Sequence, residues 1–314
     1  MRGWALGVFV GAVLSSGIRV PAAGAQDQDT PDTSVKWVNE LPATAHPRLR
    51  HGTFHSNAMN VDVGYVVYLP PSYEDSASQG RRYPVVYLLH GSGSTEVSGL
   101  WAAQRFDDAI RSGLIPPRLY VFVNGGSFSY YDFEGSLAET AFIKELIPHI
   151  DRTYRTIASR MGRAIEGFSM GSRATARDIF KYPELFCSAA ALSGVADAEL
   201  RAAKNDGTVR NNRNVGALNN ASDLAQRYAA DKAAPRIDLL VTVGANDPQR
   251  LRPTETWISH LRSLGITFEY HVVPDVPHYL PGMYEAFGDP IMRHHEQCFS
   301  NANRAQALSG KEIH

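Results

Sequence analysis

The chain has 314 residues, of which 44% are hydrophobic and 20% charged, and its 31 Lys and Arg residues nearly balance 32 Asp and Glu residues. This hydrophobic fraction excludes a disordered chain, and a formal net charge of −1 leaves no electrostatic footprint for nucleic acid or an anionic membrane surface. The 2 cysteines are too few for a disulfide scaffold, so the composition indicates a globular protein that can bury a large core.

The start of the chain is expected to lie outside the folded domain. Arg2 is followed by an apolar run from Trp4 to Leu14, and small residues then lead to Ala25. These features predict a secretory signal peptide (1–25), and therefore a secreted or periplasmic protein with no stable membrane insertion after cleavage. An uncleaved anchor is the alternative, but the run is shorter than the roughly 20 apolar residues that a bilayer needs. Residues 26–46 are polar and Pro-rich, and we expect them to be poorly ordered.

The rest of the chain, residues 47–314, alternates apolar runs with helical patterns and is predicted to form one catalytic domain. Predicted strands are 61–69, 83–89, 119–123, 163–168, 189–192, 237–243 and 268–273, and predicted helices are 101–112, 137–154, 172–181, 254–264 and 283–299. This order predicts an α/β fold, with a mostly parallel central sheet and helices on both faces. The polar stretch 195–235 interrupts the alternation between the strands ending near Ser193 and Val243. We interpret it as a lid-like insertion over the carboxyl edge of the sheet.

The segment from Gly167 to Gly171 reads GFSMG and follows a predicted strand directly before a predicted helix. In this context the G-x-S-x-G pattern predicts a nucleophile elbow, a sharp turn that exposes the hydroxyl of Ser169 above the sheet. A helix start with Ser169 as its cap is the alternative, and it leaves the two glycines unexplained.

A serine nucleophile needs a base, and the base needs a carboxylate that orients it. In this architecture the chain order is serine, acid, histidine. Asp247 follows the strand 237–243 and His278 follows the strand 268–273, so both are expected at the carboxyl edge of the sheet. Asp275 is a weaker candidate for the acid because it is too close to His278 in sequence.

An acyl-transfer site also needs N–H donors for the oxyanion. We predict the backbone N–H of Met170 as one donor, and Gly91 or Ser92, in the loop after the strand 83–89, as the second. His90 is expected to brace this loop.

The remaining histidines and the cysteines have no catalytic context. His260, His294 and His295 are expected at the surface of helices, and no metal or cofactor is predicted because the sequence has no HExxH motif and no Cys/His cluster. Cys187 and Cys298 would lie at the same end of the sheet if the last helix runs antiparallel to the strand 189–192. They would then either form a disulfide or remain two buried thiols.

Several stretches together carry a resemblance to a known family. They are the segments from His51 to Tyr73, from Tyr83 to Gly93, from Glu145 to Arg155, from Gly167 to Gly171 and from Tyr182 to Gly194. The chain resembles the putative-esterase family (esterase D and feruloyl esterase) of α/β-hydrolases from about residue 48 to about residue 285. The family includes feruloyl and acetyl-xylan esterases, S-formylglutathione hydrolases, enterochelin esterases and mycolyltransferases. The resemblance implies an α/β-hydrolase fold and assigns Ser169, Asp247 and His278 the roles of nucleophile, acid and base.

This chain departs from the family pattern at Ser172, where glycine is frequent, and at Ser92-Gly93-Ser94, where Gly-Gly pairs are common. Neither departure touches the triad, but the second could alter the width of the acyl site. An S-formylglutathione hydrolase is disfavoured because its thiol substrate is cytosolic.

Aromatic residues gather where the site is expected: Phe128, Tyr130 and Tyr131 in the loop after the strand 119–123, Phe168 in the elbow and Tyr279 beside the base. They could bind an aryl acyl group, or they could simply pack the loop onto the domain. Trp101 is expected to face the core.

The sequence therefore predicts a secreted serine carboxylic-ester hydrolase of the feruloyl or acetyl-xylan esterase type, acting on a small-molecule or polysaccharide-linked ester. Two alternatives stay open on the same triad, an acyltransferase of the mycolyltransferase type and an enterochelin-esterase-like hydrolase. A non-catalytic binding module is disfavoured by the intact Ser-Asp-His set.

Overall fold

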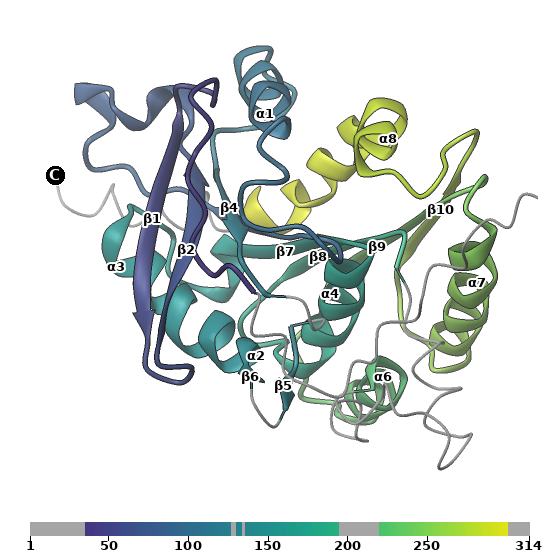
Figure 1. Ribbon diagram of the computed structural model, residues 1–314. Helices are drawn as coiled ribbons and strands as arrows, with labels where there is room; N and C mark the ends of the chain where they lie inside the picture. The colour runs from purple at the N-terminus through teal and green to yellow at the C-terminus, as the bar shows by residue number, and fades with distance from the viewer. Residues whose placement is uncertain (1–34, 127–129, 134–135, 195–219, 301–314) are drawn as a thin grey trace, which may run out of the picture.

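A central sheet of 8 strands organises the computed structural model, which describes residues 35–126, 130–133, 136–194 and 220–300 (Figure 1). The strand order is β1-β2-β4-β3-β7-β8-β9-β10. The strands are β1 (Leu49–Ser56), β2 (Val61–Tyr68), β3 (Val85–Leu89), β4 (Leu119–Val123), β7 (Arg163–Phe168), β8 (Ser188–Leu192), β9 (Asp238–Gly244) and β10 (Glu269–Val273).

The sheet is antiparallel at one edge and parallel elsewhere. β1 pairs with β2 and β2 pairs with β4 in antiparallel register, whereas the pairs from β4 through β3, β7, β8 and β9 to β10 are all parallel. Every residue of β4 and β8 is buried, as expected for strands covered on both faces. The predicted strands are thus confirmed. The segment 49–56, for which no strand was predicted, adds the edge strand β1.

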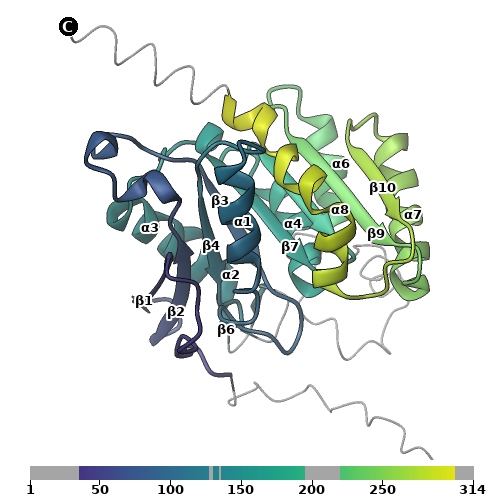
Figure 2. The same cartoon turned by 90° about the horizontal axis from the view of Figure 1, so that it is seen from above.

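Helices cover both faces of the sheet, as predicted (Figures 1 and 2). Helices α1 (Ala102–Arg111) and α8 (Leu280–His294) lie on one face. The other face carries α2 (Ala138–Thr140), α3 (Ile147–Thr153), α4 (Met170–Lys181), α6 (Ala221–Ala230) and α7 (Pro248–Ser263). A π-helical segment, Ala141–Leu146, joins α2 to α3, so the predicted helix 137–154 is one helical stretch of irregular pitch.

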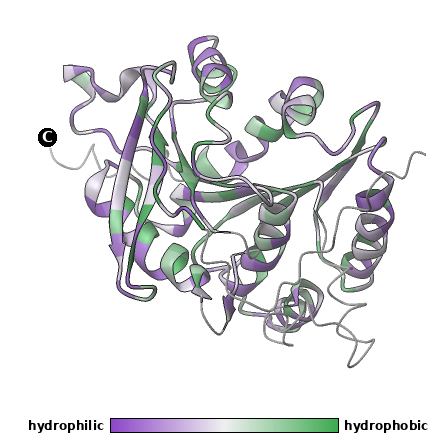
Figure 3. Cartoon of the chain, in the orientation of Figure 1, coloured by the Kyte–Doolittle hydropathy of each residue, from purple (hydrophilic) through white to green (hydrophobic). Residues whose placement is uncertain are grey.

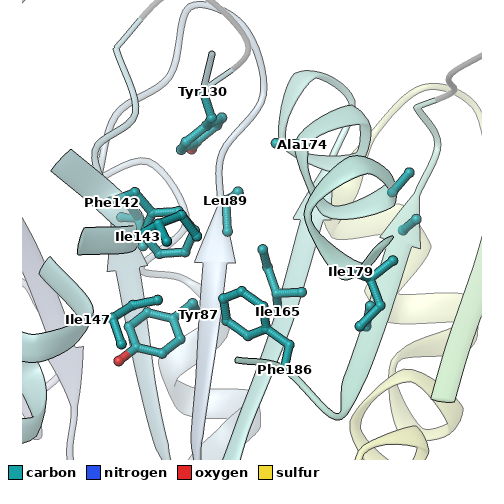
Figure 4. Close-up of a cluster of buried hydrophobic side chains, with 14 of the residues drawn as sticks. Tyr87, Leu89, Tyr130, Phe142, Ile143, Ile147, Ile165, Ala174, Ile179 and Phe186 are labelled. Atoms are coloured by element: carbon teal, nitrogen blue, oxygen red, sulfur yellow. The ribbon is translucent and has the colours of Figure 1, made fainter. Parts of the chain in front are cut away.

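Two hydrophobic clusters fill the space between the sheet and its helices. The cluster under α2, α3, α4, α6 and α7 includes Tyr87, Phe142 and Phe186, whose rings contact one another (Figure 4). The other lies under α1 and α8 and includes Phe106 stacked on Tyr120, with ring centroids 3.6 Å apart. Figure 3 shows hydrophobic residues along the inner strands and mostly hydrophilic residues on the edge strand β1. The sheet is therefore a rigid platform on which the loops at its carboxyl edge are built.

Residues 35–46 correct the expectation of a poorly ordered segment up to His46. The N–H of Gly64 in β2 donates to the carbonyl of Trp37 at 2.7 Å, and the N–H of Asn39 donates to Glu96 Oε1 at 2.8 Å. These hydrogen bonds anchor the segment to the sheet because they satisfy backbone groups that would otherwise be buried without partners. The predicted signal peptide and residues 26–34 lie outside the described residues.

The predicted lid is corrected in its second half. Residues 195–219 lie outside the described residues, but α6 packs against α4 and α7 (Figure 1). Ala221, Leu224 and Ala225 are buried in the core, and their i, i+3, i+4 spacing gives α6 an apolar stripe. This part of the insertion is consequently a core helix and not a lid.

The end of the described chain is attached covalently to the sheet. Cys298 forms a disulfide with Cys187, which directly precedes β8, and their Cα atoms are 6.0 Å apart. His295 nearby is fully buried, with Nδ1 2.8 Å from the hydroxyl of Ser188, and His294 is buried as well. The expectation that His294 and His295 lie at the surface is therefore wrong, because the last turn of α8 and the residue after it pack against the sheet. Among the described residues, no helix has the length and apolar character needed to cross a bilayer.

Candidate active site

Ser169 occupies a sharp turn between β7 and α4. Its backbone has φ 55° and ψ −111°, a conformation that non-glycine residues rarely adopt. Its N–H donates to the carbonyl of Leu192 at 2.9 Å, which fixes the turn to the neighbouring strand. A Cβ on Gly167 would lie 2.2 Å from the carbonyl oxygen of Gly171, and one on Gly171 would lie 2.1 Å from that of Leu89. Both glycines are therefore needed for the strand, the turn and the helix to pack this closely, as the elbow prediction requires.

The structure brings the three predicted triad residues into one chain of hydrogen bonds. His278 Nε2 is 2.9 Å from Ser169 Oγ, and His278 Nδ1 is 2.6 Å from Asp247 Oδ2. Asp247 is buried and His278 is about one third exposed, so the acid is shielded while the base faces the site. The exposed Asp275 has no such contact with His278.

Two loops carry the acid and the base and are joined to each other. The N–H of Asn246 donates to the carbonyl of Val276 at 3.0 Å, and the N–H of Ala245 donates to that of Val273 at 2.8 Å. The imidazole of His278 stacks on the ring of Phe168 in the elbow, with centroids 4.8 Å apart. The orientation of the base thus depends on hydrogen bonds at one end and on an aromatic surface beneath it.

The predicted oxyanion donors flank Ser169. Met170 is the first residue of α4, so its N–H has no acceptor within the helix. The loop after β3 runs beside the elbow, because a Cβ on Gly91 would lie 3.4 Å from Ser169 Cβ. Ser92 and Gly91 both line the cavity in front of Ser169.

His90 braces this loop, as expected. Its N–H donates to Tyr130 Oη at 2.8 Å, its Nε2 accepts from the N–H of Gly125 at 3.2 Å, and its Nδ1 lies 2.9 Å from the carbonyl of Gly91. Burial lowers the pKa of His90 to about 4, so the ring is neutral near pH 7 and Nδ1 carries the proton that Gly91 accepts.

A buried carboxylate holds the far end of the same loop. Glu96 is 1% exposed, and both of its oxygens accept hydrogen bonds. Asn39 donates to it from its backbone N–H and from its side chain, at 2.8 and 2.9 Å, and Asn124 Nδ2 donates at 2.8 Å. Neither Glu96 nor Asn39 was predicted from the sequence, where nothing marks them as neighbours.

A cavity of about 620 Å³ opens in front of Ser169. Its walls are mostly apolar and include Leu88, Phe122, Phe168 and Leu192. It runs between the sheet and helices α1 and α8. Glu166 of β7 also lines the cavity. Its buried carboxyl accepts a hydrogen bond from Tyr284 Oη.

The aromatic residues predicted to contact substrate divide into three groups. Phe168 and Tyr279 line the cavity. Tyr130 and Tyr131 are buried and do not line it, so their prediction as substrate contacts is wrong: Tyr130 packs against the core (Figure 4), and Tyr131 lies under the guanidinium of Arg177. Phe128 lies outside the described residues.

Trp101 was predicted to face the core and instead lines the cavity with 41% of its surface exposed. It immediately precedes α1 at the carboxyl edge of the sheet. That position is the signal that could have identified it, since ligands bind at this edge.

No metal centre is built into the described part of the chain, where no three His, Cys, Asp or Glu side chains are grouped to hold an ion.

Comparison with known proteins agrees with this geometry. The chain is 30% identical over 279 residues to Esterase Rv1288 of Mycobacterium tuberculosis, and the match covers 78% of this chain and 59% of that protein. It is 34% identical over 195 residues to an endo-1,4-beta-xylanase/feruloyl esterase of Xylanibacter ruminicola, covering 57% of this chain and 24% of that protein. The chain thus spans only part of the length of these relatives.

Among solved structures, a ferulic acid esterase superposes with a TM-score of 0.68 at 26% identity, over 80% of this chain and 98% of the other. The chain therefore has the α/β-hydrolase fold that its sequence predicts. The family model described as "Putative esterase" matches residues 56–282. Together with the geometry at Ser169, this match means that the chain belongs to the putative esterase family.

Proposed function

We propose that this protein is a carboxylic-ester hydrolase that works through a covalent acyl-enzyme. The observation that carries the proposal is the chain of hydrogen bonds from Asp247 through His278 to Ser169, at the mouth of an apolar cavity. A serine hydroxyl becomes a nucleophile when a neighbouring base removes its proton, and this arrangement supplies that base. Membership of an esterase family supports the same reaction class.

Each residue then has a defined task. Ser169 Oγ attacks the ester carbonyl while His278 Nε2 accepts its proton, and Asp247 holds Nδ1–H and stabilises the imidazolium. The N–H of Met170 and an N–H of the Gly91–Ser92 loop donate to the oxyanion of the tetrahedral intermediate. His278 then protonates the departing alcohol, and in the second half of the cycle it removes a proton from water, which releases the acid and restores Ser169.

The proposed substrates are aryl or carbohydrate-linked esters, of the feruloyl or acetyl-xylan type. The apolar walls beside Ser169 suit an uncharged acyl group, and two proteins that resemble this chain carry feruloyl or ferulic acid esterase in their names. We also propose that the chain is exported, since its first 25 residues have the pattern of a signal peptide and a disulfide joins Cys187 to Cys298.

A burst experiment tests the reaction. We expect wild-type protein mixed with excess 4-nitrophenyl acetate to release a burst of 4-nitrophenol equal to the enzyme concentration, whereas Ser169→Ala shows neither burst nor turnover. Ser172→Ala is the matched control, because its hydroxyl donates to the carbonyl of Gly194 and lies outside the triad. Equal activity in wild type and Ser169→Ala would rule the proposal out. Dominant transfer to an added sugar or glycerol hydroxyl, in place of hydrolysis, would identify an acyltransferase.

A further inference from the structure

Two large aromatic side chains are exposed at the mouth of the cavity. Tyr279 is 57% exposed and Trp101 is 41% exposed, and both line the cavity in front of Ser169. Only two other large hydrophobic side chains among the described residues, Leu137 and Val272, are comparably exposed, and neither lines this cavity. Exposed aromatic rings beside a reactive centre offer a substrate apolar surface on which it can stack.

Tyr279 lines the cavity next to the base, on the side where the alcohol of an ester has to leave. The proposed mechanism requires the departing oxygen to accept its proton from His278 Nε2, so that oxygen lies within hydrogen-bond distance of His278. Tyr279 is the next residue in the chain. Trp101 lines the same cavity, and its ring packs edge-on against Tyr284 of α8, with centroids 5.6 Å apart and an interplanar angle of 83°.

Polar groups accompany these rings. Ser94, Thr95 and Ser98, which precede Trp101 in the chain, line the cavity. Arg250 also lines it and is the third residue of α7, directly after the loop of Asp247. Within the described residues, the guanidinium of Arg250 forms no ion pair, so its N–H donors can face a ligand in the cavity. The other walls are formed mainly by apolar side chains such as Leu88, Phe122 and Leu192, and the buried Glu166 is the charged residue among them. The cavity therefore has a mostly apolar interior and a rim of aromatic rings, hydroxyls and one guanidinium.

From this division we infer that the rim formed by Trp101, Tyr279 and Arg250 is a subsite for the sugar ring of a carbohydrate ester. One face of a pyranose presents C–H groups that stack on the electron-rich face of an aromatic ring, while its hydroxyls need hydrogen-bond partners around the edge. Hydroxyl and guanidinium side chains next to two rings meet both needs. The acyl group takes the apolar interior. This inference rests on the proposed ester hydrolysis and adds to it which part of the substrate contacts which wall.

Kinetics on a matched pair of esters test the inference. Cinnamic acid is supplied either as its methyl ester or esterified to methyl β-xylopyranoside, so that only the alcohol differs. We expect Trp101→Ala and Tyr279→Ala each to lower kcat/KM for the sugar ester about fivefold to tenfold more than for the methyl ester, mainly through KM. Trp101→Phe and Tyr279→Phe keep an aromatic face, so kcat/KM for the sugar ester should stay close to the wild-type value in these variants.

Leu137→Ala serves as the control, because Leu137 is 39% exposed and lies outside the cavity lining, and both esters should then be hydrolysed at the wild-type rate. A binding measurement supports the kinetics: Ser169→Ala titrated with xylotetraose in a calorimeter should show binding that the added Trp101→Ala change weakens.

Two kinds of failure are distinguishable. If Ser169→Ala hydrolyses either ester as fast as wild type, the proposed reaction itself is wrong. The second outcome is that hydrolysis depends on Ser169 while Trp101→Ala and Tyr279→Ala lower kcat/KM for both esters by the same factor, or leave both values unchanged. In that case the rim does not bind the sugar, and only this inference is overturned.

Discussion

The backbone N–H and the side-chain amide of Asn39 both donate to the carboxylate of Glu96, at 2.8 and 2.9 Å. Asn39 lies in the segment before the first strand, whereas Glu96 lies in the loop that begins at Gly91 beside the nucleophile. The pair therefore connects the beginning of the described chain to the candidate oxyanion loop. Because Glu96 is buried, losing these two hydrogen bonds would leave its carboxylate with the single hydrogen bond from Asn124 Nδ2, which is costly for a buried charge.

We predict that Glu96→Gln lowers the free energy of unfolding by about 2 kcal/mol, because an amide accepts at only one of its two terminal atoms and the hydrogen bonds to a buried charge are lost. If the network positions the oxyanion loop, kcat should also fall while KM changes little. Urea unfolding and steady-state kinetics measure the two effects. Glu74→Gln, which breaks an exposed ion pair with Arg50, should change neither. A stability loss without any change in kcat would show that Glu96 serves folding alone.

Tyr130→Phe should lower stability by about 1 to 3 kcal/mol, because the buried N–H of His90 would lose its acceptor. We expect kcat to fall and the KM for aryl esters to stay within twofold, since Tyr130 braces the loop and does not line the cavity. Tyr228→Phe is a matched control: it removes a hydroxyl that donates to Pro235 at 3.0 Å, away from the cavity, and should leave kcat unchanged. A raised KM in Tyr130→Phe would instead indicate substrate contact.

Asp247→Asn should reduce kcat by about 10⁴-fold with little change in fold, because an amide cannot hold His278 in the tautomer that accepts the proton of Ser169. The loss is to be measured with 4-nitrophenyl acetate at pH 8, alongside a circular dichroism spectrum. Asp275→Asn provides the comparison, since this exposed carboxylate has no contact with His278 and its variant should retain wild-type activity. A reduction below tenfold would remove Asp247 from its proposed role.

The stability of the protein should depend on pH through Glu166. Burial raises the pKa of this carboxyl to about 7. The hydrogen bond from Tyr284 and the positive charge of Arg118 lower the pKa, but by less than burial raises it. His295 Nε2 is 3.6 Å from Glu166, and burial keeps the pKa of His295 well below its usual range, so it stays neutral over the interval considered. The folded state therefore binds a proton on Glu166 that the unfolded state releases above its ordinary pKa near 4.5.

A raised pKa stabilises the folded state at low pH, and this contribution is lost as pH rises through the folded value. We expect wild type to lose about 2 kcal/mol of stability between pH 5 and pH 7 relative to Glu166→Gln, which cannot titrate. Urea unfolding of both proteins across this range measures the difference in their free energies of unfolding. Contributions from other buried groups, such as Asp178, are the same in both proteins and cancel in this difference. A constant difference between the two proteins would show that Glu166 does not titrate there.

The parts of the site that follow strands could be predicted from the sequence. Ser169, Asp247 and His278 each follow the end of a predicted parallel strand, so the topology alone places them at one edge of the sheet. The glycines around Ser169 add a local signal, since the turn has no room for side chains there.

Other features depended on packing that no local pattern reveals. Tyr130 and Trp101 were both assigned from position and residue type, yet the first is buried under the loop that it braces and the second stands at the cavity mouth. The segment around Asn39 reads as a polar leader because its partners are distant in sequence: Glu96 accepts from Asn39, and Asn124 donates to the carbonyls of Lys36 and Trp37. Long-range polar contacts of this kind determine the fine structure of the site.

The disulfide between Cys187 and Cys298 affects whether the site stays assembled after proteolytic cleavage of the chain. The two cysteines are 111 residues apart, and Asp247 and His278 lie between them, whereas Ser169 precedes both. A single proteolytic cut at any peptide bond between the cysteines yields two fragments that remain covalently linked. The nucleophile stays on the first fragment. A cut before Asp247 places both of its partners on the second, so the disulfide would keep a nicked molecule assembled, and reduction would allow the fragments to separate.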